Sequence, residues 1–176
     1  MSGTRTDRLL LRPVTRDDLV AAEEVLGDPR TSEHLPGGPA SPAEAQAKLD
    51  FWVAHWRTRG FGYWAVELAG STGVLGFGGL QLGDVPGERY LNLFYRLRPS
   101  AWGHGYAAEV GRAAQAEATA RGLPVWIVTG AANEASRRVA ERLGFTEFRQ
   151  GPHQGGWSRF YRWPPGNPVA PPPAPH

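Results

Sequence analysis

The feature of this sequence that most restricts its fold is residues 90–121, where a strand pattern leads through two glycines into a helix pattern. Residues 90–97 form a long apolar run that Pro99 ends, and apolar side chains then recur at helical spacing over residues 106–121. A further apolar run, residues 125–129, follows directly. A strand, a helix and a strand in this order require a parallel crossover, which predicts an α/β fold.

The other segments surround this unit with further strands and helices. A helix that Ser41 caps, with Pro42 at its first position and Glu44 in its first turn, is predicted to end at Gly60. Strands are also predicted over residues 9–11, 63–68, 74–80, 145–149 and 157–163, helices over residues 15–26 and 133–143, and a polar loop over residues 83–89. The expected result is a single domain with a mixed central sheet of about seven strands and about four helices.

Length and composition indicate one globular domain. The chain has 176 residues, of which 41% are hydrophobic, enough for one sizeable core. Residues 164–176 are mostly proline and alanine and contain no core-forming pattern. We therefore expect a domain over residues 1–163, followed by a flexible tail over residues 164–176.

Charge and residue content argue against several functional classes. Nineteen basic and seventeen acidic residues nearly cancel, and the basic residues are scattered, so neither a nucleic acid nor a membrane is expected as partner. The absence of cysteine excludes disulfides, thiolate metal sites and a cysteine acyl-enzyme. No metal is expected either, because the histidines show no ligand-like spacing. The polar start of the chain and the lack of an apolar run of about 20 residues predict a cytoplasmic protein.

The turn Trp102-Gly103-His104-Gly105 stands between the central strand and its helix. The first amides of a helix have no intrahelical acceptor and carry the positive end of the helix dipole, and glycines let an anion approach them closely. Two interpretations stay open, a phosphate site and a tight turn that needs glycine for its conformation alone. A Walker ending is missing, and Ala108 occupies the place of the third glycine in a dinucleotide fingerprint.

Three segments in this order resemble the GNAT acetyltransferase superfamily, and within it the RimJ/RimL-like branch of ribosomal-protein N-terminal acetyltransferases. They are residues 6–12 (TDRLLLR), residues 102–109 (WGHGYAAE) and residues 133–145 (NEASRRVAERLGF). The resemblance runs from about Thr6 to Trp163. It implies a GNAT-like fold and acetyl-CoA as co-substrate, with direct transfer of the acetyl group to a primary amine.

The resemblance also implies where acetyl-CoA binds, between the fourth and fifth strands. Backbone groups of residues 95–97 are expected to pair with the pantetheine arm, amides of residues 103–107 to bind the pyrophosphate, and Asn133 to bond the arm. Ser136 is the expected catalytic residue, placed near the sulfur to protonate the leaving thiolate. The cofactor-binding residues implied in this way are Tyr95, Arg96, Leu97, Trp102, Gly103, His104, Gly105, Tyr106, Ala107, Asn133, Ser136 and Arg138.

The sequence departs from the family pattern at both proton-transfer positions. Asn92 stands where relatives often have a glutamate base, and an amide cannot take a proton. Ala140 stands where many members have a tyrosine acid. Glu33 and His34, in the early loop, are the remaining candidates for a base, with solvated loop residues as the alternative interpretation. Together with Tyr161 and Asn92, they form the expected acceptor-binding set.

These residues predict an N-acetyltransferase whose acceptor is a protein N-terminus. Acetylation of a small-molecule amine, such as an amino sugar, a polyamine or an amino-acid derivative, is the alternative. A non-catalytic acyl-CoA sensor and a nucleotide-binding module that uses the same turn also stay open. Dimers occur among relatives, so the resemblance allows a homodimer.

Overall fold

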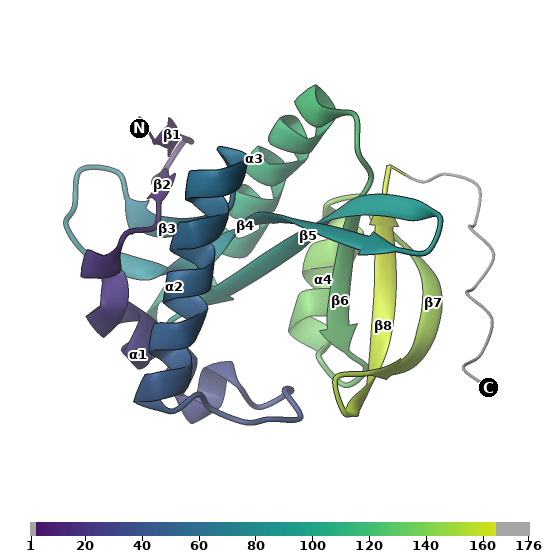
Figure 1. Ribbon diagram of the computed structural model, residues 1–176, viewed down its shortest axis with the longest axis horizontal. Helices are drawn as coiled ribbons and strands as arrows, with labels where there is room; N and C mark the ends of the chain where they lie inside the picture. The colour runs from purple at the N-terminus through teal and green to yellow at the C-terminus, as the bar shows by residue number, and fades with distance from the viewer. Residues whose placement is uncertain (1–2, 165–176) are drawn as a thin grey trace.

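The computed structural model describes residues 3–164 and contains, in that range, one mixed sheet of eight strands with four α-helices (Figure 1). The strands are β1 (Thr4–Arg5), β2 (Leu9–Pro13), β3 (Tyr63–Leu68), β4 (Val74–Val85), β5 (Glu88–Leu97), β6 (Val125–Gly130), β7 (Thr146–His153) and β8 (Gly156–Trp163). The helices are α1 (Leu19–Gly27), α2 (Pro42–Arg59), α3 (Tyr106–Arg121) and α4 (Glu134–Arg142). The predicted α/β class is confirmed, and the strand beyond the expected seven is the two-residue β1, which is too short to show a periodicity.

The caps that the sequence indicated set the limits of α2. The Ser41 N–H donates to a Glu44 carboxylate oxygen at 2.8 Å, and the Glu44 N–H donates to the Ser41 hydroxyl at 3.3 Å. Gly60 ends the helix in the left-handed region, at a φ of +73°. The predicted bounds of this helix are therefore confirmed by its capping bonds.

The polar loop predicted over residues 83–89 is wrong. Strands β4 and β5 pair without interruption as far as Val85 and Glu88, and only Pro86 and Gly87 turn between them. Ladder bonds join backbone groups, so the pairing continues through residues whose side chains face water. The strand predicted over residues 145–149 also extends further, because β7 pairs with β8 as far as residue 153.

The helices cover both faces of the sheet (Figure 1). Helices α1 and α2 pack on one face, around the buried side chains of Leu49, Trp52 and Phe77. Helix α3 packs on the other face, against Leu91 and neighbouring residues, with α4 beside it. A side chain of the sheet is therefore assigned to a face by the cluster that it joins.

The sheet opens in its middle, between the parallel strands β5 and β6. Their ladder contains only two pairs, Leu91 with Val125 and Asn92 with Trp126. Strand β5 nevertheless continues along β4 to Leu97, and β6 continues along β8 to Gly130. The two strands diverge beyond Asn92 (Figure 1), so the facing edges of their carboxyl-terminal halves are not paired with each other.

The range of residues that the structure describes bears on two sequence expectations, the flexible tail and the lack of a membrane span. Most of the predicted tail, from residue 165 onward, lies outside the described residues. Between residues 3 and 164, no helix is both long and apolar enough to cross a membrane.

Candidate functional site

The amino end of α3 lies directly after the opened part of β5 and presents a run of free amides. Gly103 and Gly105 adopt φ angles of +77° and +78°, in the left-handed region that favours glycine. The first helical bond joins the Glu109 N–H to the Gly105 carbonyl at 3.1 Å. For the amides of residues 103–108, the described part of the chain supplies no acceptor. These amides and the helix dipole together favour an anion at this end of α3.

A polar cluster around the buried Glu109 holds this turn against the start of the chain. The Arg8 guanidinium donates to the His104 carbonyl and to the Glu109 carboxylate, each at 2.8 Å. Thr6 donates to the same carboxylate at 2.6 Å, and the Arg8 guanidinium also lies 4.8 Å from the centre of the Tyr106 ring. Burial raises the pKa of Glu109, but the hydrogen bonds from Thr6 and Arg8 outweigh it and leave the pKa below its ordinary value. Glu109 is therefore an ionised anchor beneath the turn.

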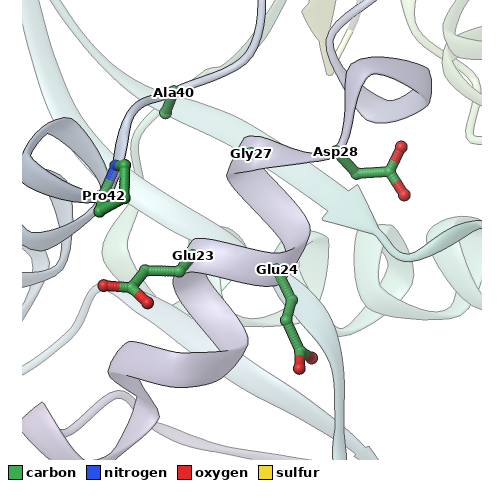
Figure 2. A pocket seen from close by; sticks show the side chains of 6 residues that line it. All are labelled: Glu23, Glu24, Gly27, Asp28, Ala40 and Pro42. Carbon is green, nitrogen blue, oxygen red and sulfur yellow. The ribbon is translucent and has the colours of Figure 1, made fainter.

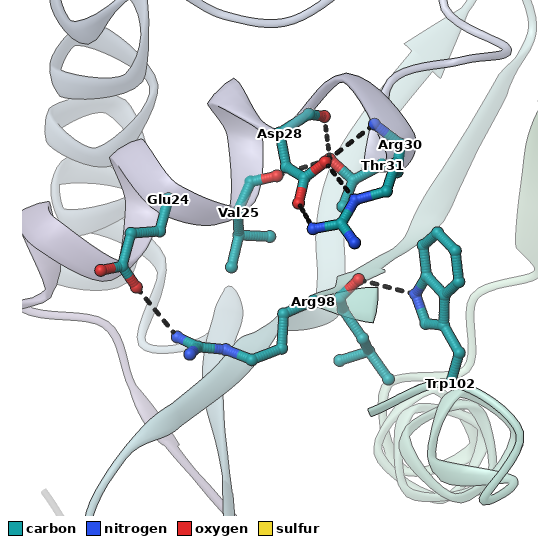
Figure 3. Close-up of polar contacts among 8 residues, drawn as sticks. Glu24, Val25, Asp28, Arg30, Thr31, Arg98 and Trp102 are labelled. Carbon is teal, nitrogen blue, oxygen red and sulfur yellow. Dashed lines mark hydrogen bonds and ion pairs between the residues drawn. The ribbon is translucent and has the colours of Figure 1, made fainter. Parts of the chain in front are cut away.

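The open edge of β5 is made of alternate backbone groups. The Leu91 N–H donates to Pro124, on the side of β6, whereas the Arg98 N–H donates to Leu75 of β4. Since successive residues of a strand direct their backbone groups to opposite edges, those of Leu93, Tyr95 and Leu97 face the opening. The Leu97 carbonyl already accepts a bond of 2.8 Å from the half-exposed Trp102 indole (Figure 3). The backbone of Arg96, by contrast, faces β4, so only its side chain is free to contact a ligand.

Two hydroxyl groups meet across the opening. Tyr95, from β5, and Ser136, from α4, lie 2.9 Å apart, oxygen to oxygen. Burial raises the pKa of Tyr95 to about 12, partly offset by the hydrogen bond with Ser136, so the phenol stays protonated at neutral pH. Asn133 caps α4 by accepting from the Ser136 N–H at 3.0 Å. This pair forms a proton-donating group on the side of the sheet that α3 and α4 cover.

Asn92 lies on the opposite face, where the strands begin to part. Its amide nitrogen donates to the hydroxyl of the buried Tyr63 at 3.1 Å. Burial raises the pKa of Tyr63 above its ordinary value, so this hydroxyl is also protonated. Neither group takes up a proton readily at neutral pH, and this face therefore lacks a base at that position.

The acceptor-binding residues predicted from the sequence do not all lie together. Glu33 and His34 are exposed in the loop between α1 and α2, and the His34 backbone lies against Gly130 at the end of β6. Tyr161 is buried in the cluster on the face of α3 and α4, opposite Asn92. The predicted set is therefore divided between the two faces of the sheet.

The two arginines of α4 differ in whether they are paired. Arg137 is engaged by Glu134 and Glu141, whereas Arg138 is exposed and has no side-chain partner within residues 3–164. Of these two arginines, Arg138 is the one available to a phosphate.

A hollow beside α1 is separate from this site (Figure 2). It is lined by Glu23, Glu24, Gly27, Asp28, Ala40 and Pro42. Two of its carboxylates are engaged, Glu24 by Arg98 at 3.2 Å and Asp28 by Arg30 at 2.6 Å (Figure 3). Its acidic lining disfavours an anionic ligand. Among residues 3–164, no group of three or more histidine or acidic side chains is placed to hold a metal ion.

Sequence reasoning missed the side-chain role of Tyr95 and the cluster beneath the turn. Thr6 and Glu109 each belong to a recognisable segment, but more than a hundred residues separate them, and neither segment shows a period that links them. Tyr95 meets Ser136 only because β5 and β6 diverge, which no local pattern indicates.

Comparisons with known proteins bear on the family and the fold of the chain. A family model described as an acetyltransferase (GNAT) domain matches residues 8–146. An acetyltransferase from Agrobacterium tumefaciens is 27% identical with a TM-score of 0.79, over 93% of this chain and 94% of that chain. The RimL ribosomal L7/L12 alpha-N-protein acetyltransferase in complex with coenzyme A is 16% identical with a TM-score of 0.72, over 89% and 94%. The microcin C7 self-immunity acetyltransferase MccE, in complex with acetyl-CoA and AMP, is 12% identical with a TM-score of 0.72, over 89% and 92%.

Proposed function

Because the chain belongs to the GNAT acetyltransferase family, we propose that it moves an acetyl group from acetyl-CoA to the primary amine of a protein N-terminus. The observation that carries the proposal is the run of free amides at the amino end of α3, next to the open edge of β5. The RimJ/RimL-like resemblance favours a protein N-terminus as the acceptor. RimL itself is described as an alpha-N-protein acetyltransferase of ribosomal L7/L12.

The cofactor fits the opening in a specific direction. The pyrophosphate binds the amides of residues 103–108, and the exposed Arg138 is available to a further phosphate of the cofactor. The pantetheine arm carries amide groups and pairs with the exposed backbone of Leu93 and Tyr95, as a third strand would. The arm then brings the thioester to the Tyr95–Ser136 pair, where β5 and β6 part.

Transfer proceeds by direct attack of a neutral amine. The amine nitrogen forms a bond to the thioester carbonyl carbon, and the backbone N–H of Leu93 stabilises the oxyanion. The carbon–sulfur bond then breaks, and the thiolate takes a proton from the Ser136 hydroxyl. Ser136 takes a proton from the Tyr95 phenol in turn, and solvent water returns one to Tyr95. The amine gives up its own proton to Glu33 or His34, in the loop that lies over the end of β6, directly or through water.

Calorimetric titration of acetyl-CoA into the protein tests the cofactor site, with ATP as the comparison ligand. One-site binding that prefers acetyl-CoA is expected. Gly105→Glu places a carboxylate among the free amides and should weaken binding by about a hundredfold or more, because a bound phosphate would lie beside a like charge. Gly70→Glu is the matched control, since Gly70 has a φ of +82° and open space around it. Equal affinity of both variants would contradict the placement of the pyrophosphate.

Acceptor-dependent release of free CoA separates an enzyme from a protein that only binds acyl-CoA. Amine-bearing peptides that carry a free N-terminus should raise the rate of CoA release, and the same peptides with a blocked N-terminus should not. The structure of MccE, a protein of similar fold, holds AMP beside acetyl-CoA, and small amines are therefore the second set to screen. Binding of acetyl-CoA without release in any mixture would identify the non-catalytic alternative.

A further inference from the structure

Arg96 lies on the opened half of β5, on the face that α1 and α2 cover. It pairs across the ladder with the fully buried Phe77, and its guanidinium carbon lies 5.5 Å from the centre of the Phe94 ring. Phe94 in turn stacks on Tyr63 at 4.8 Å, and Tyr63 bonds Asn92. Alternate residues of a strand share a face, so Asn92, Phe94 and Arg96 form one row along it.

The Arg96 guanidinium has no counter-ion or side-chain hydrogen bond within residues 3–164, although it is half-buried. Arg98, the first residue after β5, is paired with Glu24 at 3.2 Å (Figure 3). Arg12, another half-buried arginine, is held by Asp18 and Glu67. Burial lowers the pKa of Arg96 to about 10, so it remains charged at neutral pH and costs free energy while it stays unpaired.

The position of Arg96 relative to the opening indicates whether the acceptor or the cofactor would contact its side chain. The Tyr95–Ser136 pair lies on the other face of the same strand, next to the proposed place of the thioester. An amine that approaches the thioester from the face of Asn92 passes along the row that ends at Arg96. The free amides of α3, by contrast, follow Leu97 and face the proposed phosphates.

We propose that Arg96 binds an anionic group, a carboxylate or a phosphate, on the amine acceptor. The inference rests on the proposed acetyl transfer, because it assigns the acceptor to the face of the sheet opposite the Tyr95–Ser136 pair. Arginine matches the planar, two-oxygen geometry of either anion, and Phe94 restricts its side chain beforehand.

Binding of matched amines to the CoA-saturated protein tests this assignment. The pairs are an amino acid and its amide, phosphoethanolamine and ethanolamine, and two tripeptides with aspartate or asparagine in second place. These arms distinguish a free carboxylate, a phosphate and an acidic peptide. In at least one pair, the anionic member should bind about tenfold or more tightly, as one charge-assisted bidentate contact predicts.

Arg96→Met should abolish this preference while the affinity for acetyl-CoA stays within about twofold, and Arg96→Lys should restore part of it. Arg98→Met is the matched control, since it removes the same charge two residues further along the chain but leaves Arg96 in place. A native protein without preference in all three pairs would overturn the inference, and so would a loss confined to acetyl-CoA binding, which would assign Arg96 to the cofactor. Failure of acetyl-CoA to bind the native protein would instead refute the proposed function.

Thermal unfolding of the unliganded variants gives a second, independent measurement. An unpaired arginine that binds a ligand lowers the stability of the unliganded protein. Arg96→Met should therefore unfold at the same temperature as the native protein or higher. Arg98→Met removes the existing ion pair with Glu24, so its Tm should not rise above that of the native protein. A clear drop in the Tm of Arg96→Met alone would show that Arg96 serves the fold and would contradict a ligand-binding role.

Discussion

A hydrogen bond between the hydroxyls of Tyr95 and Ser136 joins the two sides of the opened sheet. Tyr95 comes from β5 and Ser136 from the helix that follows β6, so the bond exists only when both strands are in place. Because burial keeps the phenol protonated, the pair offers a proton throughout the neutral range. The family position for a tyrosine acid is the fully buried Ala140, and the proposed acid is instead this pair, with its tyrosine on another element.

Tyr95→Phe and Ser136→Ala should each lower kcat by roughly a hundredfold, the lower end of the range for general acid catalysis. The affinity for acetyl-CoA should stay unchanged, because backbone groups bind the cofactor. The double variant should lose little more than either single one, since the two residues act as a unit. Tyr90→Phe is the control, because Tyr90 also lies on β5 but stacks on Trp126. Full turnover in Tyr95→Phe would remove this role.

At this scale, the sequence predicted residue types better than residue partners. The sequence has an amide, Asn92, in a place where relatives often have a base, and in the structure this amide donates to the Tyr63 hydroxyl. The side chain of Tyr95 was not predicted to act, because Ser136 lies 41 positions away and joins it only through the divergence of two strands. Arg96 was predicted through its backbone, which faces β4, whereas its side chain proved to be the unusual feature.

At the scale of elements, the amino end of α3 is held by a segment from the other end of the domain. Arg8 links the His104 carbonyl to the Glu109 carboxylate, and Thr6 completes the cluster. Glycines at two positive φ angles leave the turn with many accessible conformations, so an external anchor is needed to keep its amides convergent.

Arg8→Ala should therefore weaken acetyl-CoA binding by about tenfold and leave kcat at saturation within about twofold, since the anchor acts on binding and not on the reacting atoms. Arg8→Lys should recover only part of the affinity, because an ammonium cannot bond both partners in the same plane. Arg16→Ala is the control, as its exposed pair with Asp50 lies outside the cluster. A loss of kcat with unchanged affinity would contradict the anchor.

The ends of helices and strands were predictable where neighbouring residues determine them. They were not predictable where pairing with another strand determines them. The capping bonds of Ser41 and Asn133 follow from neighbouring residues, and both helices begin at the predicted positions. The β4–β5 hairpin extends through polar residues because its partner strand continues, and that information lies in the ladder. The two-residue β1 is likewise defined only by its pairing with β2.

At the scale of the molecule, the order of elements was enough to predict the fold class. A strand, a helix and a strand required one parallel crossover, and β5 and β6 are indeed parallel neighbours. The small number of pairs between them could not be predicted, because both segments read as ordinary apolar strands. The opening that defines the candidate site is thus a property of the assembled sheet.

The two buried tyrosines beside the opening predict alkaline instability. Burial raises the pKa of Tyr95 to about 12 and that of Tyr63 above its ordinary value, which is 10.0 for an unperturbed tyrosine. Since the folded pKa exceeds the unfolded one, this stability is fully present below pH 10 and is lost as the pH rises through 12.

The free energy of unfolding, measured with denaturant between pH 8 and pH 12, should fall by about 1.4 kcal/mol per pH unit for each tyrosine proton that unfolding releases. Tyr95→Phe should show a shallower fall over the same range. A free energy that stays constant up to pH 12 would show that neither phenol resists ionisation.

The open edge of β5 also bears on how such a protein changes over evolutionary time. An edge made of main-chain groups looks the same whichever side chains stand on the strand, so substitutions accumulate there without erasing it. The 27% identity to the Agrobacterium tumefaciens protein, at a TM-score of 0.79, shows how far sequence can drift while the framework persists. The row of Asn92, Phe94 and Arg96 is made of side chains, so each substitution there changes its chemistry. On the proposed assignment of that row to the acceptor, single codon changes on one face exchange the acceptor, while the main-chain edge proposed to bind the acetyl donor is retained.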